Sequence, residues 1–497
     1  MSEHNHINKQ IAKGSAWMVV FKIFEKSISI VSTIILARLL SPEDFGLAAI
    51  ALLVVTLLEL LRAFNFDMAL IHNQDATDEH YNTAWTFNII ATAIISILLI
   101  CAAPLVSSFY DDERLFNIFL VLSFGVFVSG FENIGVVVFR KELEFHKEFA
   151  FLLGKKLIGF LVGIGLALYL KNHWALVGGT VATHVGIVLI SYYIQGYRPR
   201  LSVSKAKELF GFSSWLFINN LMNFLNYKMP EAIIGKLSGT SSLGFFTVSA
   251  DIAKLGSTEI VLPVNRAAYP GYSKLNRDYQ ALKNSFLNTQ GILALIIIPA
   301  SLGIAAITPV MVPVLLGEKW LDTIPILQLL TISFMLASLG NIQSIYMAIG
   351  KPRIMTFIFS IRIIVTLPLF SYFSYYYDLI SAVTSMIAAA LIMLPISFYF
   401  IMRELKIKQS ELISIIIRPT LSGLMMYYSI HSVIHQYIRN TPSNYSVQDL
   451  LSLIVFGVLI YTISTYVLWA ISGKPHAGET HVLNAVIQKY RKIFMNT

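Results

Sequence analysis

Long apolar segments recur along the whole of this chain and restrict what it can fold into. Of its 497 residues, 56% are hydrophobic and 13% are charged, whereas soluble domains carry about 25% charged residues. A window of 18 or more mostly apolar residues is long enough to cross a bilayer as a helix. Because the apolar runs are continuous rather than alternating, helices are expected and membrane strands are not. The sequence therefore predicts an all-α integral membrane protein.

The apolar segments number about 14 and are joined by short loops. The longest loop is expected around residues 266–285. With the N-terminus inside, the inner segments hold 21 Lys and Arg residues and the outer loops hold 6. Because cytoplasmic loops are enriched in these residues, both termini are predicted in the cytoplasm. The predicted transmembrane helices cover about residues 14–37, 43–64, 83–108, 115–139, 149–170, 173–195, 209–235, 242–265, 286–312, 322–349, 353–377, 379–402, 412–435 and 449–472.

The first two spans resemble the seventh and eighth. Residues 15–17 (SAW) align with residues 213–215 (SSW), and residues 45–47 (FGL) align with residues 243–245 (LGF), at an offset of 198. A repeat of six spans keeps both copies in one orientation, related by an axis along the membrane normal. We therefore expect two six-helix lobes that rock around a central site, followed by two C-terminal helices. The predicted divisions are residues 1–200 (N-terminal lobe), 201–405 (C-terminal lobe), 406–475 (two further spans) and 476–497 (a basic amphipathic cytoplasmic tail).

Charged side chains lie inside three of the predicted spans. A charge at the bilayer centre costs about 2.5–3.5 kcal/mol on insertion scales. Such groups are therefore expected to face a water-filled cavity inside the protein. Lysines outnumber carboxylates among them, which favours a transporter of something polar and anionic. The residues are Lys22, Glu25 and Lys26 in the first span, Lys228 and Glu231 in the seventh, and Asp251 and Lys254 in the eighth.

These charges and nearby polar groups form the predicted site. The cations are expected to neutralise an anionic headgroup, and the asparagines to contact sugar hydroxyls. The carboxylates are candidates for ion coupling. The predicted substrate-binding cations are Lys22, Lys26, Arg62, Lys228, Lys254 and Arg362; the sugar contacts are Asn219, Asn220, Asn223 and Asn226; the ion-coupling carboxylates are Glu25, Glu231 and Asp251.

Each of these assignments has a structural alternative. The charges of the first span either line the cleft or form an ion-pair network between helices. Intramembrane asparagines commonly join helices, and Arg62 either binds phosphate or extends to the inner interface. His184 is interpreted as a partner in an interhelical hydrogen bond, and Lys155 as lying close to the inner boundary.

No pattern typical of an enzyme stands out. The sequence has no glycine-rich phosphate loop, no metal-ligand spacing and a single cysteine, Cys101. We therefore expect no metal, no cofactor, no nucleic-acid partner and no enzymatic activity. Two other functions stay open: a multidrug exporter, which would favour an acidic cavity, and a membrane enzyme of polysaccharide assembly, which would carry a long outer loop.

Several stretches resemble a known family. They are LARLLSPEDFGLAAIAL (residues 36–52), FRKELEF (139–145), LGFFTVSADIAKL (243–255), AYPGYSKL (268–275) and LLGEKWLDTIPILQLL (315–330). Together they resemble the Wzx-type polysaccharide and O-antigen flippases, closest to the colanic-acid-exporter-like branch of the multidrug/oligosaccharidyl-lipid/polysaccharide exporter superfamily. The resemblance runs from about residue 10 to residue 405.

The resemblance implies a function and a location. It implies a flippase in the bacterial inner membrane that moves an undecaprenyl-pyrophosphate-linked oligosaccharide from the inner to the outer leaflet by alternating access. Coupling to a proton or sodium gradient is part of this expectation. The implied partners are that lipid-linked substrate, membrane lipid and the polysaccharide polymerase and export machinery.

Overall fold

The computed structural model describes residues 2–62, 66–73, 75–209, 214–440 and 445–473. Within these ranges every regular element is a helix, which confirms the all-α prediction. Ten helices of the described part are long and apolar enough to cross a membrane, or up to 11 if one bent pair counts as one span. The chain is a multi-pass membrane protein. The predicted tail helix at residues 476–497 lies outside the described residues.

The chain divides into two compact units, Met1–Gly244 and Phe245–Thr497. The helices that begin in the first unit are α1 (Ser2–Leu39), α2 (Pro42–Glu59), η1 (Leu60–Arg62), α3 (Phe66–His72), α4 (Asp78–Tyr110), α5 (Arg114–Ser129), η2 (Ile134–Val136), α6 (Val137–Lys141), α7 (Phe145–Leu170), α8 (Trp174–Ile194), α9 (Ala206–Leu209), α10 (Ser214–Leu237) and α11 (Gly239–Leu255). The second unit continues with α12 (Thr258–Leu275), α13 (Tyr279–Leu315), η4 (Glu318–Trp320), α14 (Thr323–Leu339), α15 (Gln343–Ala348), α16 (Pro352–Tyr376), α17 (Leu379–Glu404), α18 (Gln409–Asn440) and α19 (Val447–Ile471). The expected division into six-span lobes at residues 200 and 201 stays a prediction.

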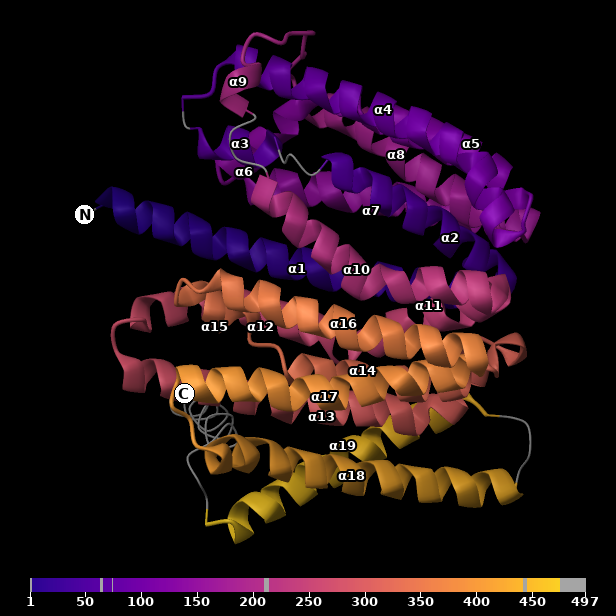
Figure 1. Cartoon of the computed structure of the whole chain (residues 1–497), viewed down its shortest axis with the longest axis vertical. Helices are drawn as coiled ribbons and strands as arrows, with labels where there is room; N and C mark the ends of the chain where they lie inside the picture. Colours follow the sequence, from indigo (N-terminus) through magenta and orange to yellow (C-terminus); the bar gives the residue numbers. More distant parts are fainter. Residues whose placement is uncertain (1, 63–65, 74, 210–213, 441–444, 474–497) are drawn as a thin grey trace, which may run out of the picture. The chain divides into compact units, whose positions relative to one another are not determined.

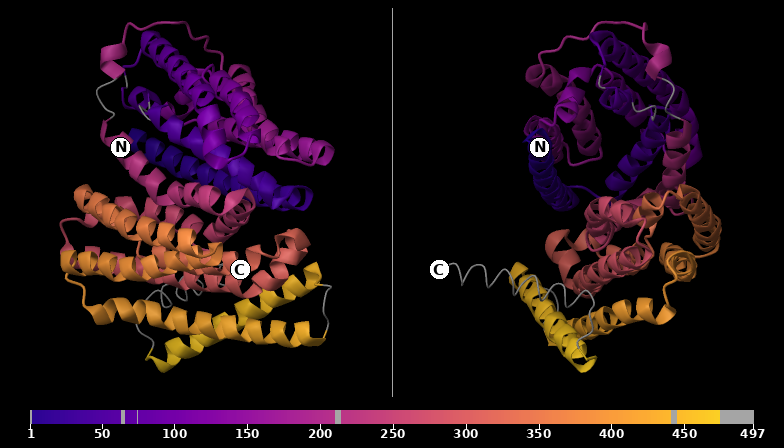
Figure 2. Two further views of the ribbon diagram at one scale, coloured as in Figure 1. Left: turned by 45° about the vertical axis from the view of Figure 1, so that its right-hand side comes forward. Right: turned by 90° about the vertical axis from the view of Figure 1, so that its left-hand side faces the viewer.

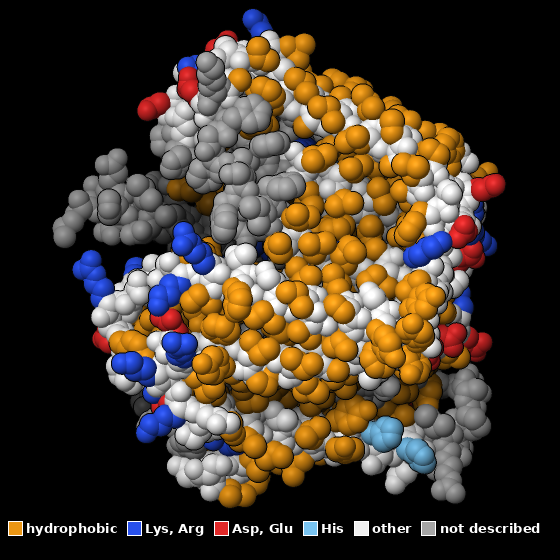
Figure 3. Space-filling view, viewed as in Figure 1, with side chains coloured by type: hydrophobic (Ala, Val, Ile, Leu, Met, Phe, Trp, Pro, Cys, Tyr) orange, Lys and Arg blue, Asp and Glu red, His pale blue; other side chains and the backbone are white. Residues whose placement is uncertain are grey.

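Each of the 14 predicted spans coincides with one or more of these helices. The spans predicted at residues 14–37, 209–235 and 242–265 correspond to α1, α10 and the α11–α12 pair. These helices are absent from the ten that qualify by length and hydropathy, and they are the helices that carry the predicted intramembrane charges. Figure 3 shows hydrophobic side chains over the middle of the helices, with charged side chains toward their ends.

The span predicted at residues 242–265 is not one continuous helix. Helix α11 ends at Leu255 and α12 begins at Thr258. At the break, the Ser301 hydroxyl of α13 donates a hydrogen bond of 3.0 Å to the carbonyl oxygen of Gly256. This bond satisfies a carbonyl that the interrupted helix leaves without an intrahelical donor. A side chain remote in sequence therefore stabilises the break.

The long loop predicted around residues 266–285 is wrong. Helix α12 continues to Leu275 and α13 begins at Tyr279, so only a short turn separates them. Asp278 caps α13 by accepting a hydrogen bond of 3.0 Å from the Ala281 amide. Tyr272 on α12 is buried beside Phe286 in one hydrophobic cluster. Burial of this aromatic side chain offsets the poor helix propensity of a segment that contains two prolines.

In the first unit, α7 packs against both α1 and α8, α8 packs against α5, and α5 packs against α4 (Figure 1). The α7–α8 pair is close because glycines face the partner helix. A Cβ atom on Gly179 would lie 3.0 Å from the Gly163 Cα, and one on Gly159 would lie 2.1 Å from the Thr183 Oγ1. Small residues let membrane helices approach in this way. In the second unit, α19 crosses α18 obliquely (Figure 2).

Helix α2 meets the start of α11 in a reciprocal contact. A Cβ atom on Gly46 would lie 1.8 Å from the carbonyl oxygen of Thr240, and one on Gly244 would lie 1.8 Å from that of Pro42. Gly46 and Gly244 are equivalent under the repeat of 198 residues, and so are Pro42 and Thr240. Reciprocal contacts of this kind are the signature of two-fold related surfaces. They support the internal repeat inferred from the sequence.

The segment between α8 and α10 lies along α4. The Tyr197 hydroxyl donates to Asn82 Oδ1 over 2.9 Å, and the Ser202 amide donates to the Thr86 hydroxyl over 2.9 Å. On α9, Glu208 pairs with the buried His80, with 2.8 Å between Oε2 and Nε2. Burial raises the pKa of Tyr197 to about 12. This connection is therefore fixed to the first unit over much of its length.

Candidate functional site

Two of the predicted lysines in the first unit are paired with carboxylates on their own helix. The distance between Lys22 Nζ and Glu25 Oε2 on α1 is 2.6 Å, and that between Lys228 Nζ and Glu231 Oε2 on α10 is 2.7 Å. The spacing of three residues places each pair on one helix face. The Glu231 side chain is 6% exposed, whereas that of Lys22 is 47% exposed. Local pairing therefore reduces the cationic character expected of these two helices.

The second unit contributes a third pair and a separate arginine. On α11, Lys254 Nζ lies 3.3 Å from Asp251 Oδ1. The Asp251 side chain is 67% exposed, so this pair is weaker than one shielded from water. Arg362 on α16 is half-buried. Lys254, Asp251 and Arg362 thus lie on helices of the second unit, and their role in binding stays a prediction.

The predicted sugar contacts lie along α10. Asn220 and Asn226 are half-buried and Asn223 is exposed, while the side chain of Asn219 lies outside the described residues. The Asn226 amide nitrogen donates a hydrogen bond of 2.9 Å to the Met222 carbonyl oxygen. One of the two donor hydrogens of Asn226 is thereby used within its own helix. Contact between the remaining amide groups of these asparagines and sugar hydroxyls stays a prediction.

Arg62 is held at the end of α2 by a neighbouring helix. It follows Glu59 by three residues in η1, and both side chains are half-buried. The Arg62 Nε donates a hydrogen bond of 3.0 Å to Asn88 Oδ1 on α4. This contact fixes one edge of the guanidinium group. The other nitrogens of a guanidinium can then serve a bidentate acceptor such as a phosphate or a carboxylate.

Two groups that the sequence interpretation set aside accompany Arg62. Lys155 on α7 interacts electrostatically with Glu59, and His184 on α8 interacts electrostatically with both Lys155 and Arg62. All four side chains are half-buried. The glycine-mediated packing of α7 on α8 fixes the helices that carry Lys155 and His184. Four helical elements therefore carry two cations, a carboxylate and an imidazole that interact electrostatically.

Helices α1 and α10 carry further polar groups near the level of Arg62 along the helices of the first unit. The ring of Phe24 lies 6.5 Å from that of Phe149, so α1 contacts α7 two residues before Lys26 and six residues before Lys155 along their chains. On α10, Gly235 lies beside Ile50 of α2, and Asn226 and Glu59 are each nine residues from that contact along antiparallel helices. We call Lys26, Glu59, Arg62, Asn88, Lys155, His184 and Asn226 the polar layer of the first unit.

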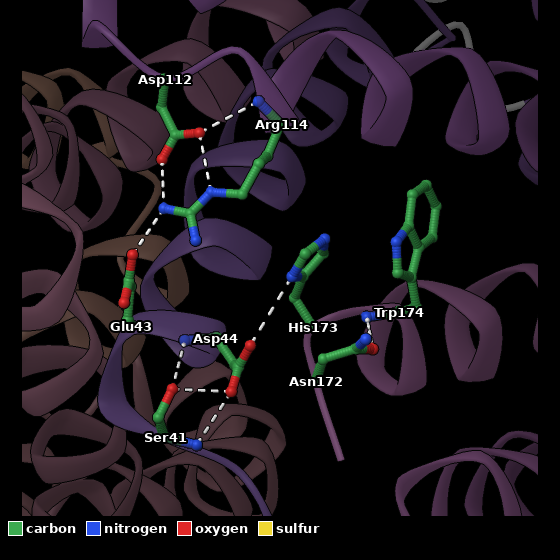
Figure 4. Close-up of polar contacts among 8 residues, drawn as sticks. All are labelled: Ser41, Glu43, Asp44, Asp112, Arg114, Asn172, His173 and Trp174. Atoms are coloured by element: carbon green, nitrogen blue, oxygen red, sulfur yellow. Dashed lines mark hydrogen bonds and ion pairs between the residues drawn. The ribbon is translucent and has the colours of Figure 1, made fainter. Parts of the chain in front are cut away.

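The opposite ends of these helices carry a separate network. Arg114 binds Glu43 over 2.5 Å and Asp112 over 2.7 Å, which links the turn before α5 to the start of α2 (Figure 4). The hydrogen bond from Arg114 holds the pKa of Asp112 below its usual range. This network joins turns, and we assign it a structural role.

The same end includes a second contact between turns. Asp44 caps α2 together with Ser41, whose hydroxyl accepts a hydrogen bond of 3.3 Å from the Asp44 amide. The carboxylate oxygen Oδ1 of Asp44 lies 3.6 Å from His173 Nδ1 in the turn before α8 (Figure 4). These contacts bring the starts of α2 and α8 together at the end of the unit away from Arg62.

The polar layer was only partly predictable. Lys26, Arg62 and Asn226 belong to the predicted site, whereas Lys155, His184 and Glu59 do not. Their sequence signal was charge or polarity within or beside an apolar segment. The electrostatic interactions of Lys155 and His184 depend on the packing of α7 and α8, which no spacing along the chain reports. Among the described residues, no group of three or more His, Cys, Asp and Glu side chains could hold a metal ion.

Residues 35–325 match the family described as "Polysaccharide biosynthesis protein". The chain belongs to this polysaccharide biosynthesis protein family. The matched segment contains Arg62, Lys155, Lys228 and Lys254, whereas Lys22 and Lys26 precede it. The segment that matches the family therefore contains most of the residues of the predicted site.

Individual relatives agree with the family match. The chain is 24% identical over 351 residues to the lipopolysaccharide biosynthesis protein WzxC of Escherichia coli K12, covering 69% of this chain and 70% of that protein. It is 20% identical over 464 residues to the succinoglycan biosynthesis transport protein ExoT of Rhizobium meliloti, covering 92% of each. Among solved structures, the lipid II flippase MurJ in an inward closed conformation aligns with a TM-score of 0.71 and 14% identity, covering 91% of this chain and 98% of MurJ. The polysaccharide biosynthesis protein family member described here thus has the MurJ fold.

Proposed function

We propose that this protein is a flippase that moves an undecaprenyl-pyrophosphate-linked oligosaccharide from the cytoplasmic to the periplasmic leaflet of the bacterial inner membrane. Family membership and the names of the relatives support polysaccharide assembly, and the ExoT name supports transport. The observation that carries the proposal is the polar layer, where Arg62 and Lys155 lie half-buried on membrane helices. A pyrophosphate group needs cations such as Arg62 and Lys155 to neutralise its charge. Charged side chains are excluded from helix faces that contact lipid, so these two cations favour a polar site inside the protein.

In this proposal, each part of the site has a role. Lys26, Arg62 and Lys155 attract the pyrophosphate, and Lys22, Lys228, Lys254 and Arg362 extend the cationic path. Asn219, Asn220, Asn223 and Asn226 contact the sugars. Glu25, Glu231 and Asp251 couple transport to an ion gradient when their pairs open. The polyprenyl tail stays in the lipid, and both chain termini lie in the cytoplasm.

The competing functions fit these features less well. A multidrug exporter for cationic compounds needs excess carboxylates at its site, and the polar layer combines Lys26, Arg62 and Lys155 with a single carboxylate, Glu59. A membrane enzyme needs a reacting nucleophile or acid–base pair positioned near its substrate. The name of the ExoT relative favours transport over catalysis, so we propose transport without a catalytic step, with the polymerase and export machinery acting on the product.

A deletion strain tests this function. Without the protein, the lipid-linked oligosaccharide is expected to accumulate in the inner leaflet, and surface polysaccharide is expected to disappear. A blocked polymerase would instead leave single repeat units on the outer leaflet. Normal movement of the lipid intermediate together with a change in drug tolerance alone would contradict the proposal and favour the multidrug exporter.

A further inference from the structure

Two exposed arginines flank an ion pair that joins the start of α16 to the end of α17 in the second unit. The two helices pack against each other, and Lys351 Nζ lies 2.6 Å from Glu404 Oε1 at this end. Arg353 follows Lys351 by two residues. Arg403 directly precedes Glu404, and both arginines are exposed. Because the ion pair holds these helix ends together, the two arginines lie on neighbouring helices at the same end of the unit.

The carboxylates near these arginines are engaged by other cations. Glu404 is the carboxylate of the ion pair, and Glu411 Oε2, at the start of α18, lies 2.8 Å from Lys283 Nζ. Among the residues that the structure describes, no carboxylate pairs with Arg353 or Arg403. The chain therefore leaves two positive charges available for an external anion at this end of α16 and α17.

An exposed aromatic side chain lies one helical turn further into the membrane than each arginine. Phe357 follows Arg353 by four residues on α16, and Tyr399 precedes Arg403 by four residues on α17, so each pair shares a helix face. Both aromatic residues are more than half exposed. The ring centroid of Phe400 lies 6.0 Å from that of Phe357 and 5.9 Å from that of Tyr399. The two pairs therefore form one surface, which we call the α16–α17 headgroup surface.

This surface matches the order of groups in a phospholipid. Four residues of a helix rise about 6 Å, and the headgroup layer of a bilayer is roughly 5–7 Å thick on each side. Arginines at the level of a lipid phosphate therefore place the aromatic rings where the acyl chains begin. Figure 3 shows the same order on this face, with Lys and Arg side chains at the left-hand ends of the helices and hydrophobic side chains over their middle. In the predicted topology, this end lies in the cytoplasmic leaflet.

We propose that the α16–α17 headgroup surface binds an anionic phospholipid of the cytoplasmic leaflet. Arg353 and Arg403 bind the phosphate, which arginine contacts through paired hydrogen bonds. Phe357 and Tyr399 contact the glycerol and the first methylene groups of the chains. The bound lipid links α16 to α17 beside the existing ion pair, so it stabilises the folded chain. The inference is independent of the proposed flippase function, because these residues lie outside the polar layer.

A general attraction between basic turns and anionic lipid is the competing explanation. Other exposed cations lie at helix ends of the second unit, including Lys274 and Arg277 near the end of α12. If total charge alone attracts the lipid, removing this pair weakens binding as much as removing Arg353 and Arg403. If the headgroup surface is a site, only the loss of its own two arginines weakens binding. A comparison of the two pairs separates the explanations.

The first experiment titrates dioleoylphosphatidylglycerol into the purified full chain in a neutral detergent and follows bound lipid by native mass spectrometry. We expect Arg353→Gln/Arg403→Gln to bind the first phosphatidylglycerol roughly tenfold more weakly than the wild type, which corresponds to about 1.4 kcal/mol. The matched control Lys274→Gln/Arg277→Gln removes the same charge and should keep the wild-type affinity. Equal losses by the two double variants, or no loss by either, overturn the proposal.

A second measurement follows stability and covers a failure of the double variant to fold. Phosphatidylglycerol should raise the melting temperature of the wild type because it binds the folded chain, and Arg353→Gln/Arg403→Gln should lose most of this rise. If the double variant does not fold, Arg353→Gln and Arg403→Gln are tested singly, and each is expected to bind the lipid roughly threefold more weakly. Wild-type affinity in both single variants overturns the proposal.

Three further ligands identify the source of the phosphate group. Glycerol 3-phosphate carries the charge without acyl chains and should not displace phosphatidylglycerol at equal concentration; displacement shows a site for soluble anions and overturns the proposal. Dioleoylphosphatidylcholine carries the chains without net charge, and binding as tight as that of phosphatidylglycerol overturns it as well. Undecaprenyl pyrophosphate stands in for the proposed substrate. If it displaces phosphatidylglycerol at a lower concentration than phosphatidylglycerol itself requires, the surface belongs to the substrate and the assignment to an ordinary phospholipid is wrong.

Discussion

The intramembrane charges of this chain are mostly compensated on their own helices. Lys22 and Glu25 form such a pair on α1, as do Lys228 and Glu231 on α10. The spacing of three residues already made these pairs predictable. The electrostatic interaction of Lys155 with Glu59 was not predictable, because it depends on tertiary packing between segments far apart in the sequence.

The Lys228–Glu231 pair gives a prediction for stability. Lys228→Ala leaves the buried Glu231 carboxylate without its lysine, so the free energy of unfolding should fall by about 1–3 kcal/mol. Thermal unfolding in detergent measures the loss, and adding Glu231→Gln should recover much of it. Lys254→Ala is the matched control, because the exposed Asp251 stays hydrated and the expected change is about 0–1 kcal/mol. Equal losses in the two variants would refute the argument.

Lys26 is the residue of α1 for which we predict a direct effect on transport. Lys26→Ala should abolish export at normal protein levels, because the phosphate site loses a cationic contact worth about 1.5–3 kcal/mol. Lys26→Arg keeps the charge and should retain part of the export. Surface polysaccharide in a complemented deletion strain measures both. Normal export by Lys26→Ala would remove this lysine from the site.

At the scale of the elements, the contact between α2 and α11 is the tightest described above, and it gives a second prediction for stability. In Gly46→Ala the new Cβ would start 1.8 Å from the Thr240 carbonyl oxygen, so the backbone must shift and the melting temperature should fall. Gly165→Ala on α7 is the control, since its Cβ meets nothing within 4 Å. Replacing this helical glycine should stabilise the chain by about 0.5–1 kcal/mol. A Gly46→Ala variant as stable as Gly165→Ala would contradict the close contact.

The connection between α8 and α10 should respond to acid. Hydrogen bonds from Lys205 and, to a smaller extent, His80 hold the pKa of Glu208 below its usual value of 4.5. Because the folded-state pKa is lowered, the attachment is fully present above the unfolded-state pKa of Glu208. It is lost as the pH falls through the lower, folded-state pKa. Hydrogen exchange of residues 197–208, corrected for intrinsic rates, should accelerate in that range. Glu208→Gln should remove this pH dependence, and a persisting transition would assign it to another group.

Helix boundaries were harder to predict than helices. Each apolar segment forms a helix because its length and hydropathy are local properties. The break between α11 and α12 was missed because the Ser301 hydroxyl that stabilises it belongs to α13. The helical end of α12 was missed because burial of Tyr272 outweighs the local effect of Pro263 and Pro270.

At the scale of the whole molecule, the repeat is the feature that sequence and structure share most directly. The alignment at an offset of 198 equates Gly46 with Gly244 and Pro42 with Thr240, and the structure places Gly46 against Thr240 and Gly244 against Pro42. A transporter built from two related copies can alternate between two arrangements around one site. The polar layer lies on helices of the first copy and on the first helix of the second.

The most direct test of the account is transbilayer movement by the purified protein. A lipid-linked oligosaccharide is incorporated in vesicles, and its exposure on the outer leaflet is followed with a lectin that cannot cross the membrane. The account predicts rapid exposure with the wild-type chain and little with Lys26→Ala or with empty vesicles. Exposure at the same slow rate with and without the wild-type chain, under an imposed ion gradient of either direction, would contradict it.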